Sequence, residues 1–146
     1  MAVGDRNDPY GAFNFLLEID GLAVAGFSEV SGIATESDVV EYREGNQLAT
    51  MKKLPGLIKY SQIGLKRGFT QNVELWDWRK STENGQTLRL GGAVVLLDEA
   101  RQPVLRIKFR EGWISKWEGP ALNSANSEVA IESLEIAHEG IDLEVA

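Results

Sequence analysis

The chain has 146 residues, a formal net charge of −7, a sequence pI near 4.8 and no cysteine. This length allows a sizeable core in one domain, and the missing cysteines exclude disulfides and cysteine-bound metals. The acidic balance argues against charge-driven binding to nucleic acid or to anionic membranes. No apolar run resembles a signal peptide or a membrane span. We therefore expect residues 1–146 to form a single domain without membrane insertion or specific nucleic-acid binding.

The N-terminal part of the chain predicts three strands. In FNFLLEIDG, residues 13–21, apolar and polar side chains largely alternate, which is typical of a half-buried strand. Its Asp-Gly end favours a hairpin turn, after which AVAGFSEVSGI, residues 23–33, forms the partner strand. ESDVVEYRE, residues 36–44, is expected to extend as a third strand.

A long polar segment follows, EYREGNQLATMKKLPG, residues 41–56. It begins acidic, turns basic at Lys52 and Lys53, and ends in a Pro-Gly step that predicts a break. Segments of this length between strands are usually functional or mobile. We predict an arm over about residues 36–58, with a plain surface hairpin as the alternative. LIKYSQIGLKRGF, residues 57–69, then resumes strand character.

One short helix is predicted over about residues 72–82. Asn72 is a suitable N-cap, and the Asn84-Gly85 step is a typical stop. Leu75 and Trp78 share one helical face, so we expect both side chains to reach a core.

A second hairpin is predicted in RLGGAVVLLDEARQPVLRIKFREGW, with strands over residues 93–97 and 104–110 and a turn at DEARQP. WISKWEGP, residues 113–120, continues the sheet. Alternation in the returning strand separates a basic face from an apolar face. The basic face carries Arg106, Lys108 and Arg110, and the apolar face carries Leu105, Ile107 and Phe109.

The C-terminal segment SEVAIESLEIAHEG, residues 127–140, is compatible with two structures. Its glutamates fall at helical spacing, and Ile131 and Leu134 share a helical face, which favours a helix. A strand would need a bulge at Glu132-Ser133 to bring both apolar side chains inward. From Glu128 to the end there are six acidic residues and no lysine or arginine, a pattern typical of a solvated face.

Residues for catalysis are scarce. His138 is the only histidine, so neither a histidine metal cluster nor a Ser-His-Asp arrangement is easy to build, and no phosphate-binding glycine loop is present. We therefore expect no enzymatic activity and no cofactor. The tryptophans could form a binding surface, but packing in the core or at an interface is the more common role of such residues. They are Trp76, Trp78, Trp113 and Trp117.

Six segments taken in order resemble a known family: YGAFNFLLEIDG, AGFSEVSGI, VVEYREG, KLPGLIKYSQIGLKRG, LWDWRKS and VAIESLEIAHEGI. They resemble tail-tube proteins of contractile phages, and more closely the inner-tube proteins of phage-tail-like contractile injection systems. The resemblance implies a small β-barrel or sandwich with one short helix and an extended β-hairpin arm, as in the tube protein of type VI secretion. It also implies that residues 127–140 form a strand, which we adopt.

The resemblance further implies a structural subunit in which six copies close into a ring and rings stack into a hollow tube. Implied partners are other copies of the chain, a contractile sheath, baseplate, spike and tube-terminator proteins, and a payload in the lumen. Assembly would occur in the bacterial cytoplasm, before the particle is released. The alternatives are a tube-cap or baseplate adaptor of the same fold and, more remotely, a small enzyme with pockets between subunits.

In the family, the arm reaches neighbouring subunits, and complementary charges on it would set register and orientation between copies. Because a tube should not retain its payload, we also expect the lumen to carry more Asp and Glu than Lys and Arg. The arm residues expected to make contacts between subunits are Glu36, Asp38, Glu41, Tyr42, Arg43, Glu44, Lys52, Lys53, Leu54 and Lys59.

Overall fold

Strands dominate the part of the chain that the computed structural model describes, residues 14–20, 24–43, 45, 50–69, 73–125 and 130–145. The predicted mainly β fold class with one short helix is confirmed. No helix within those ranges is long and apolar enough to span a membrane. The elements are β1 (Asn14–Ile19), β2 (Val24–Phe27), β3 (Glu29–Ser31), β4 (Thr35–Tyr42), β5 (Lys52–Tyr60), β6 (Ile63–Gly68), α1 (Glu74–Glu83), β7 (Leu90–Leu97), β8 (Pro103–Glu118), β9 (Ile131–Ala137) and β10 (Ile141–Val145).

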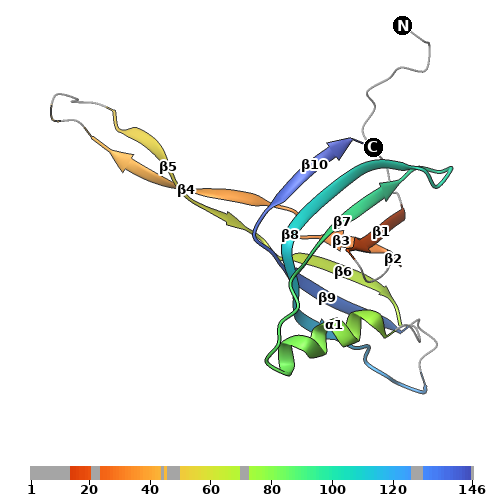
Figure 1. Cartoon of the computed structure of the whole chain (residues 1–146). Coiled ribbons are helices and arrows are strands. Elements are labelled where there is room, and N and C mark those ends of the chain that lie inside the picture. The colour runs from red at the N-terminus through yellow and green to blue at the C-terminus, as the bar shows by residue number, and fades with distance from the viewer. Residues whose placement is uncertain are drawn as a thin grey trace, which may run out of the picture.

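Eight of these strands form one antiparallel sheet that curls into a barrel (Figure 1). Its order is β2-β1-β7-β8-β9-β6-β3, and β10 pairs separately with β8. The long strand β8 bends through the barrel, pairing with β7 and β10 in its first part and with β9 in its last. Only Ser28 separates β2 from β3, and its backbone N–H donates to the Lys66 carbonyl at 2.9 Å. The two ends of the sheet order therefore meet.

The main hydrophobic core lies between the strands and α1, which covers one end of the barrel (Figure 1). Leu75 and Trp78 of α1 are buried in this core, as their helical spacing predicted. The Trp78 indole N–H donates to the Leu88 carbonyl at 2.7 Å, so burial leaves no unpaired donor there. The core side chains with the least exposure are Leu17, Ile63, Leu65, Val94, Ile114, Leu134 and Ile136.

The helix and both predicted hairpins lie close to their expected positions. Helix α1 has Val73 at its N-cap position without a side-chain cap, while the predicted cap Asn72 lies outside the described residues. The helix ends at Glu83 with Asn84 as its C-cap, and Gly85 has a positive φ of 81°. β1 pairs with β2, and β7 pairs with β8 across a turn in which the Gln102 N–H donates to Asp98 Oδ1 at 2.9 Å.

In the C-terminal segment Ile131–Ala137 form a strand, as the resemblance implied, so the helix favoured by the periodicity is wrong. β9 pairs with β6 in unbroken register, which also makes the predicted bulge at Glu132-Ser133 wrong. Instead, Glu132 points inward beside Leu134, and Ile131 is 48% exposed. The expectation of a solvated acidic face is therefore wrong for Glu132, because Arg67 lies inside the barrel to pair with it.

Candidate functional site

The arm is a separate two-stranded sheet made by β4 and β5 (Figure 1). Pairing runs from Thr35 opposite Tyr60 to Tyr42 opposite Lys52, and the hairpin projects well beyond the barrel. The eight residues of β4 correspond to about 26 Å of extended chain. An isolated two-stranded sheet is marginally stable in water. The arm therefore has the reach and the open strand edges to contact another molecule.

The Pro-Gly step did not act as the predicted breaker, because β5 runs through Pro55 and Gly56 to Tyr60. The register shifts between Ser37 and Val39, so Gly56 and Leu57 form a bulge opposite Asp38, while Pro55 pairs with Val39. A two-stranded sheet has open edges, where proline is tolerated. Gly56 also permits close approach, since a Cβ there would lie 3.2 Å from the Asp38 Cβ.

Apolar side chains on the arm are exposed. Leu57 is 74% exposed, Val39 62% and Ile58 61%. Val40, Tyr42, Met51 and Leu54 are also exposed on the same hairpin. Many exposed apolar side chains on one small element are a feature of interaction sites. This apolar content is a second reason, besides charge, to regard the arm as an interface.

The structure brings several of the predicted charged arm residues together within one hairpin. The Lys59 ammonium lies 3.0 Å from Asp38 Oδ1, and the register places Glu36 opposite Lys59 and Glu41 opposite Lys53. Tyr42, Arg43, Lys52 and Leu54 lie towards the tip, whereas Glu44 lies outside the described residues.

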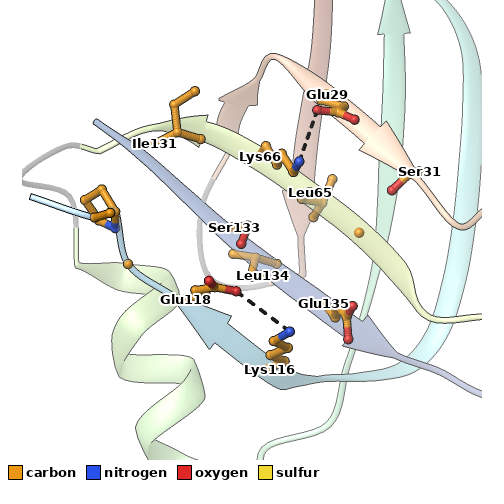
Figure 2. Close-up of a pocket in the computed structure, with 14 residues that line it drawn as sticks. Glu29, Ser31, Leu65, Lys66, Lys116, Glu118, Ile131, Ser133, Leu134 and Glu135 are labelled. Atoms are coloured by element: carbon orange, nitrogen blue, oxygen red, sulfur yellow. Dashed lines mark ion pairs between the residues drawn. The ribbon is translucent and has the colours of Figure 1, made fainter. Parts of the chain in front are cut away.

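A groove of about 600 Å³ opens between β3, β6, β9 and the end of β8 (Figure 2). Its walls carry two ion pairs, Lys66 with Glu29 and Lys116 with Glu118, each at 3.7 Å. Glu135 adds a third carboxylate, so the lining carries more acid than base. Ile131, Pro120 and Ala121 supply an apolar margin. The groove therefore suits a partner that is both apolar and basic.

The four tryptophans do not form one surface. Trp78 belongs to the core, and Trp113 is half-buried, with the Arg89 guanidinium 6.0 Å from its ring centroid. Trp76 and Trp117 meet edge to face at 4.7 Å beside Phe69. Trp78 therefore packs in the core, Trp117 is partly buried against that core, and Trp76 is exposed beside it.

Sequence reasoning missed the buried ion pair between Arg67 on β6 and Glu132 on β9. The Trp117 indole donates to the second carboxylate oxygen of Glu132 at 3.3 Å, and the Arg67 guanidinium lies over the Phe27 ring at 5.4 Å. Glu132 lies two residues before Leu134, so in a strand both side chains share one face, and this spacing was the sequence signal that could have placed Glu132 inside the barrel. Among the described residues, no group of three or more His, Asp or Glu side chains is arranged to hold a metal ion.

Comparison with known proteins gives the arm and groove a context. A family model for the T4-like virus tail tube protein gp19 matches residues 11–142. No curated protein matches the chain. Among solved structures, the chain resembles one from the PVC sheath-tube complex of an extracellular contractile injection system in the extended state, with a TM-score of 0.83 and 20% identity over 96% of this chain and 94% of that one.

Two further solved structures share the fold. A chain from the anti-feeding prophage tube-terminating cap has a TM-score of 0.82 and 18% identity, and the likeness covers 100% of both chains. A type six secretion system protein has a TM-score of 0.62 and 9% identity over 90% of this chain and 83% of that one. At these identities the likeness establishes the fold.

Proposed function

The chain belongs to the T4-like virus tail tube protein family, and on this premise we propose that six copies join into a ring whose stacked repeats form the inner tube of a contractile tail or injection system. The single observation that carries the proposal is the family match over residues 11–142, which includes the arm and nearly all of the barrel. The subunit acts structurally, and the lumen of the tube passes the payload.

Ring closure in this proposal uses the open edges of the sheet. Within the described residues β10 pairs with β8 alone, so its other edge presents unpaired backbone groups. β2 lies at the far end of the β1-β7-β8 run and pairs with β1 alone among the described strands, since the backbone bond to β6 is made by Ser28, beyond the end of β2. Pairing β10 of one copy with β2 of the next is a heterologous contact, and such contacts close into rings when the rotation allows. Closure would also remove edges prone to aggregation.

Stacking of rings uses the arm and the groove. The exposed apolar side chains of β4 and β5 need cover, and Lys52 and Lys53 make the distal part of the arm basic. The groove in Figure 2 has an apolar margin and an excess of carboxylates. We assign the groove as the acceptor for the arm of a neighbouring copy, because both its apolar content and its charge are complementary to the arm. Many such contacts in one lattice act together.

The other partners follow from the family and the compared structures. The PVC structure is a sheath-tube complex, which supports a contractile sheath around the proposed tube. Baseplate, spike and terminator proteins would contact its two ends. Assembly in the bacterial cytoplasm followed by release as part of an extracellular particle fits this arrangement.

A second candidate function is a tube-cap or baseplate adaptor of the same fold. The likeness to the anti-feeding prophage cap, over the full length of both chains, favours it. A tube subunit should polymerise with copies of itself, whereas a cap should stop at one ring. Self-assembly therefore separates the two functions.

The test is electron microscopy of the purified chain over a range of concentrations, with and without a preformed baseplate. Stacked rings of indefinite length support the tube subunit. Single rings that bind only to the ends of existing tubes support the cap. A monomer at every concentration, even beside a baseplate, contradicts both functions.

A further inference from the structure

The arm has two faces of different character. In a paired ladder, residues opposite each other point to the same side of the sheet, and residues two apart along a strand share a side. One face therefore carries Ser37, Val39 and Glu41 of β4 and their partners Ile58, Pro55 and Lys53 of β5. We call it the apolar face of the arm, because Val39, Pro55 and Ile58 are all exposed on it.

The opposite face is occupied by charges of the hairpin itself. Asp38 forms its ion pair with Lys59 there, at 3.0 Å, and Glu36 lies opposite Lys59. The bulge interrupts the same face, since a Cβ on Gly56 would lie 3.2 Å from both the Asp38 Cβ and the Val40 Cγ2. The apolar face is therefore the side of the arm that gains most from being covered.

The centre of the groove has small residues between charged ones (Figure 2). The strand register places Ser133 between Lys66 and Glu118, and Gly64 beside Glu135. Gly64 has no side chain and Ser133 has a short one, so apolar groups of another molecule can approach the sheet closely there. The groove can therefore accept the flat face of a hairpin, with its apolar side chains towards this floor.

The charges of the arm and the groove form two matching cross-strand pairs. Glu41 lies opposite Lys53 on the apolar face of the arm, and Lys116 lies opposite Glu135 in the groove. Within the part of the chain that the structure describes, Glu135 and Lys53 take part in no ion pair. Laid face to face, Lys53 meets Glu135 while Glu41 meets Lys116. The reverse placement would bring like charges together, so the two pairs select one orientation of the arm.

We propose that the apolar face of the arm is the face buried on the groove of a second copy, and that Lys53 pairs there with Glu135. The inference rests on the proposed function, in which stacking brings the arm of one copy to the barrel of another. It adds which side of the hairpin is covered and which carboxylate selects the register. The side chains of Val39, Pro55 and Ile58 lie over the small floor of the groove.

The first test exchanges the charges. Lys53→Glu and Glu135→Lys should each shorten tubes about two-fold or more in electron micrographs, because each places like charges together at every junction. The variant with both changes restores opposite charges and should form tubes close to the parent length. Glu99→Lys is the control, since it makes the same charge change on the exposed β7–β8 turn, outside the arm and the groove, and should leave the tubes normal.

The second test identifies the buried face. Because the sequence has no cysteine, Ile58→Cys with Ser133→Cys introduces two thiols on the surfaces proposed to meet. Oxidation of assembled tubes should give a ladder of covalent oligomers on a denaturing gel without reductant. Val40→Cys with Ser133→Cys places the first thiol on the opposite face of the arm and should give a much weaker ladder.

Several results would overturn the contact. These are parent-length tubes in both single charge variants, no recovery when the two changes are combined, or equal ladders from the two cysteine pairs. Circular dichroism of the monomeric fraction checks the fold, and the cysteine pairs still decide if a charge variant is unfolded. Normal parent tubes that ignore all these changes overturn the contact alone, whereas a parent that forms no tube overturns the tube function and the contact with it.

Discussion

Replacing Glu132 by glutamine should destabilise the fold far more than the same change at an exposed glutamate. Glu132 forms an ion pair with Arg67 inside the barrel, where the two side chains are only 6% and 8% exposed. In Glu132→Gln the guanidinium loses the carboxylate beside it while it stays in a buried site, where Arg67 is only 7% exposed. Removing one partner of a buried pair costs about 3–5 kcal/mol.

The matched control is Glu118→Gln. Glu118 pairs with Lys116 at 3.7 Å, but both side chains are more than half exposed. Exposed pairs contribute little, so this variant should stay within about 0.5 kcal/mol of the parent. Urea denaturation followed by tryptophan fluorescence gives both free energies of unfolding.

A double variant tests the cause. Arg67→Met with Glu132→Leu removes both charges and fills the space with apolar groups, so its stability should return to within about 1 kcal/mol of the parent. If Glu132→Gln cost no more than Glu118→Gln, loss of the Glu132 charge beside the buried Arg67 would carry no special penalty. The reasoning about the barrel interior would then be refuted.

Three further predictions concern assembly, acid stability and the lumen. The double variant Lys52→Glu with Lys53→Glu should keep the free energy of unfolding of the monomer within about 0.5 kcal/mol of the parent but shorten the tubes seen in micrographs. The control with arginine at both positions should form normal tubes. Normal tubes in the glutamate variant would contradict a role of the arm in stacking. The Lys108 ammonium, 2.6 Å from the Glu144 carboxylate, holds the pKa of Glu144 below its ordinary value of 4.5. This stabilisation is present above pH 4.5 and is lost as the pH falls through the lower pKa of the folded state. In urea titrations, Glu144→Gln should therefore lose less stability than the parent when the pH is lowered from about 5 into the acid range. An equal loss in both proteins would argue against the pair. In a cryo-electron microscopy structure of the tube, the lumen should carry more Asp and Glu than Lys and Arg. This should hold even if the basic face of β8 lines the lumen, because Arg106 and Lys108 on that face pair with Glu18 and Glu144. A net positive wall would contradict the prediction.

Local patterns were sufficient wherever one residue type dominates each face of an element. The period-two alternation before and after Ile107 predicted β8, because a strand with one buried face requires it. Leu75 and Trp78, one helical turn apart, predicted the buried face of α1. The Asn84-Gly85 stop depended on backbone conformations that these residues adopt easily.

Long-range partners decided what those patterns left open. The spacing of Ile131 and Leu134 favoured a helix, but Arg67 on a neighbouring strand makes an inward Glu132 favourable and lets β9 run without a bulge. Pro55 and Gly56 looked like a break, and only pairing with β4 shows that the strand continues through them, with Gly56 in a bulge opposite Asp38.

The candidate site also has one part that the sequence determined and another that only the tertiary structure decided. The sequence by itself determined that the segment around Lys52 and Lys53 is long, polar and split in charge, since these are properties of composition. The groove, the Asp38–Lys59 pair and the contact of His138 with the Ser61 carbonyl join residues far apart in the chain. No local pattern encodes such distances, because they arise only when the strands have paired and the barrel has closed.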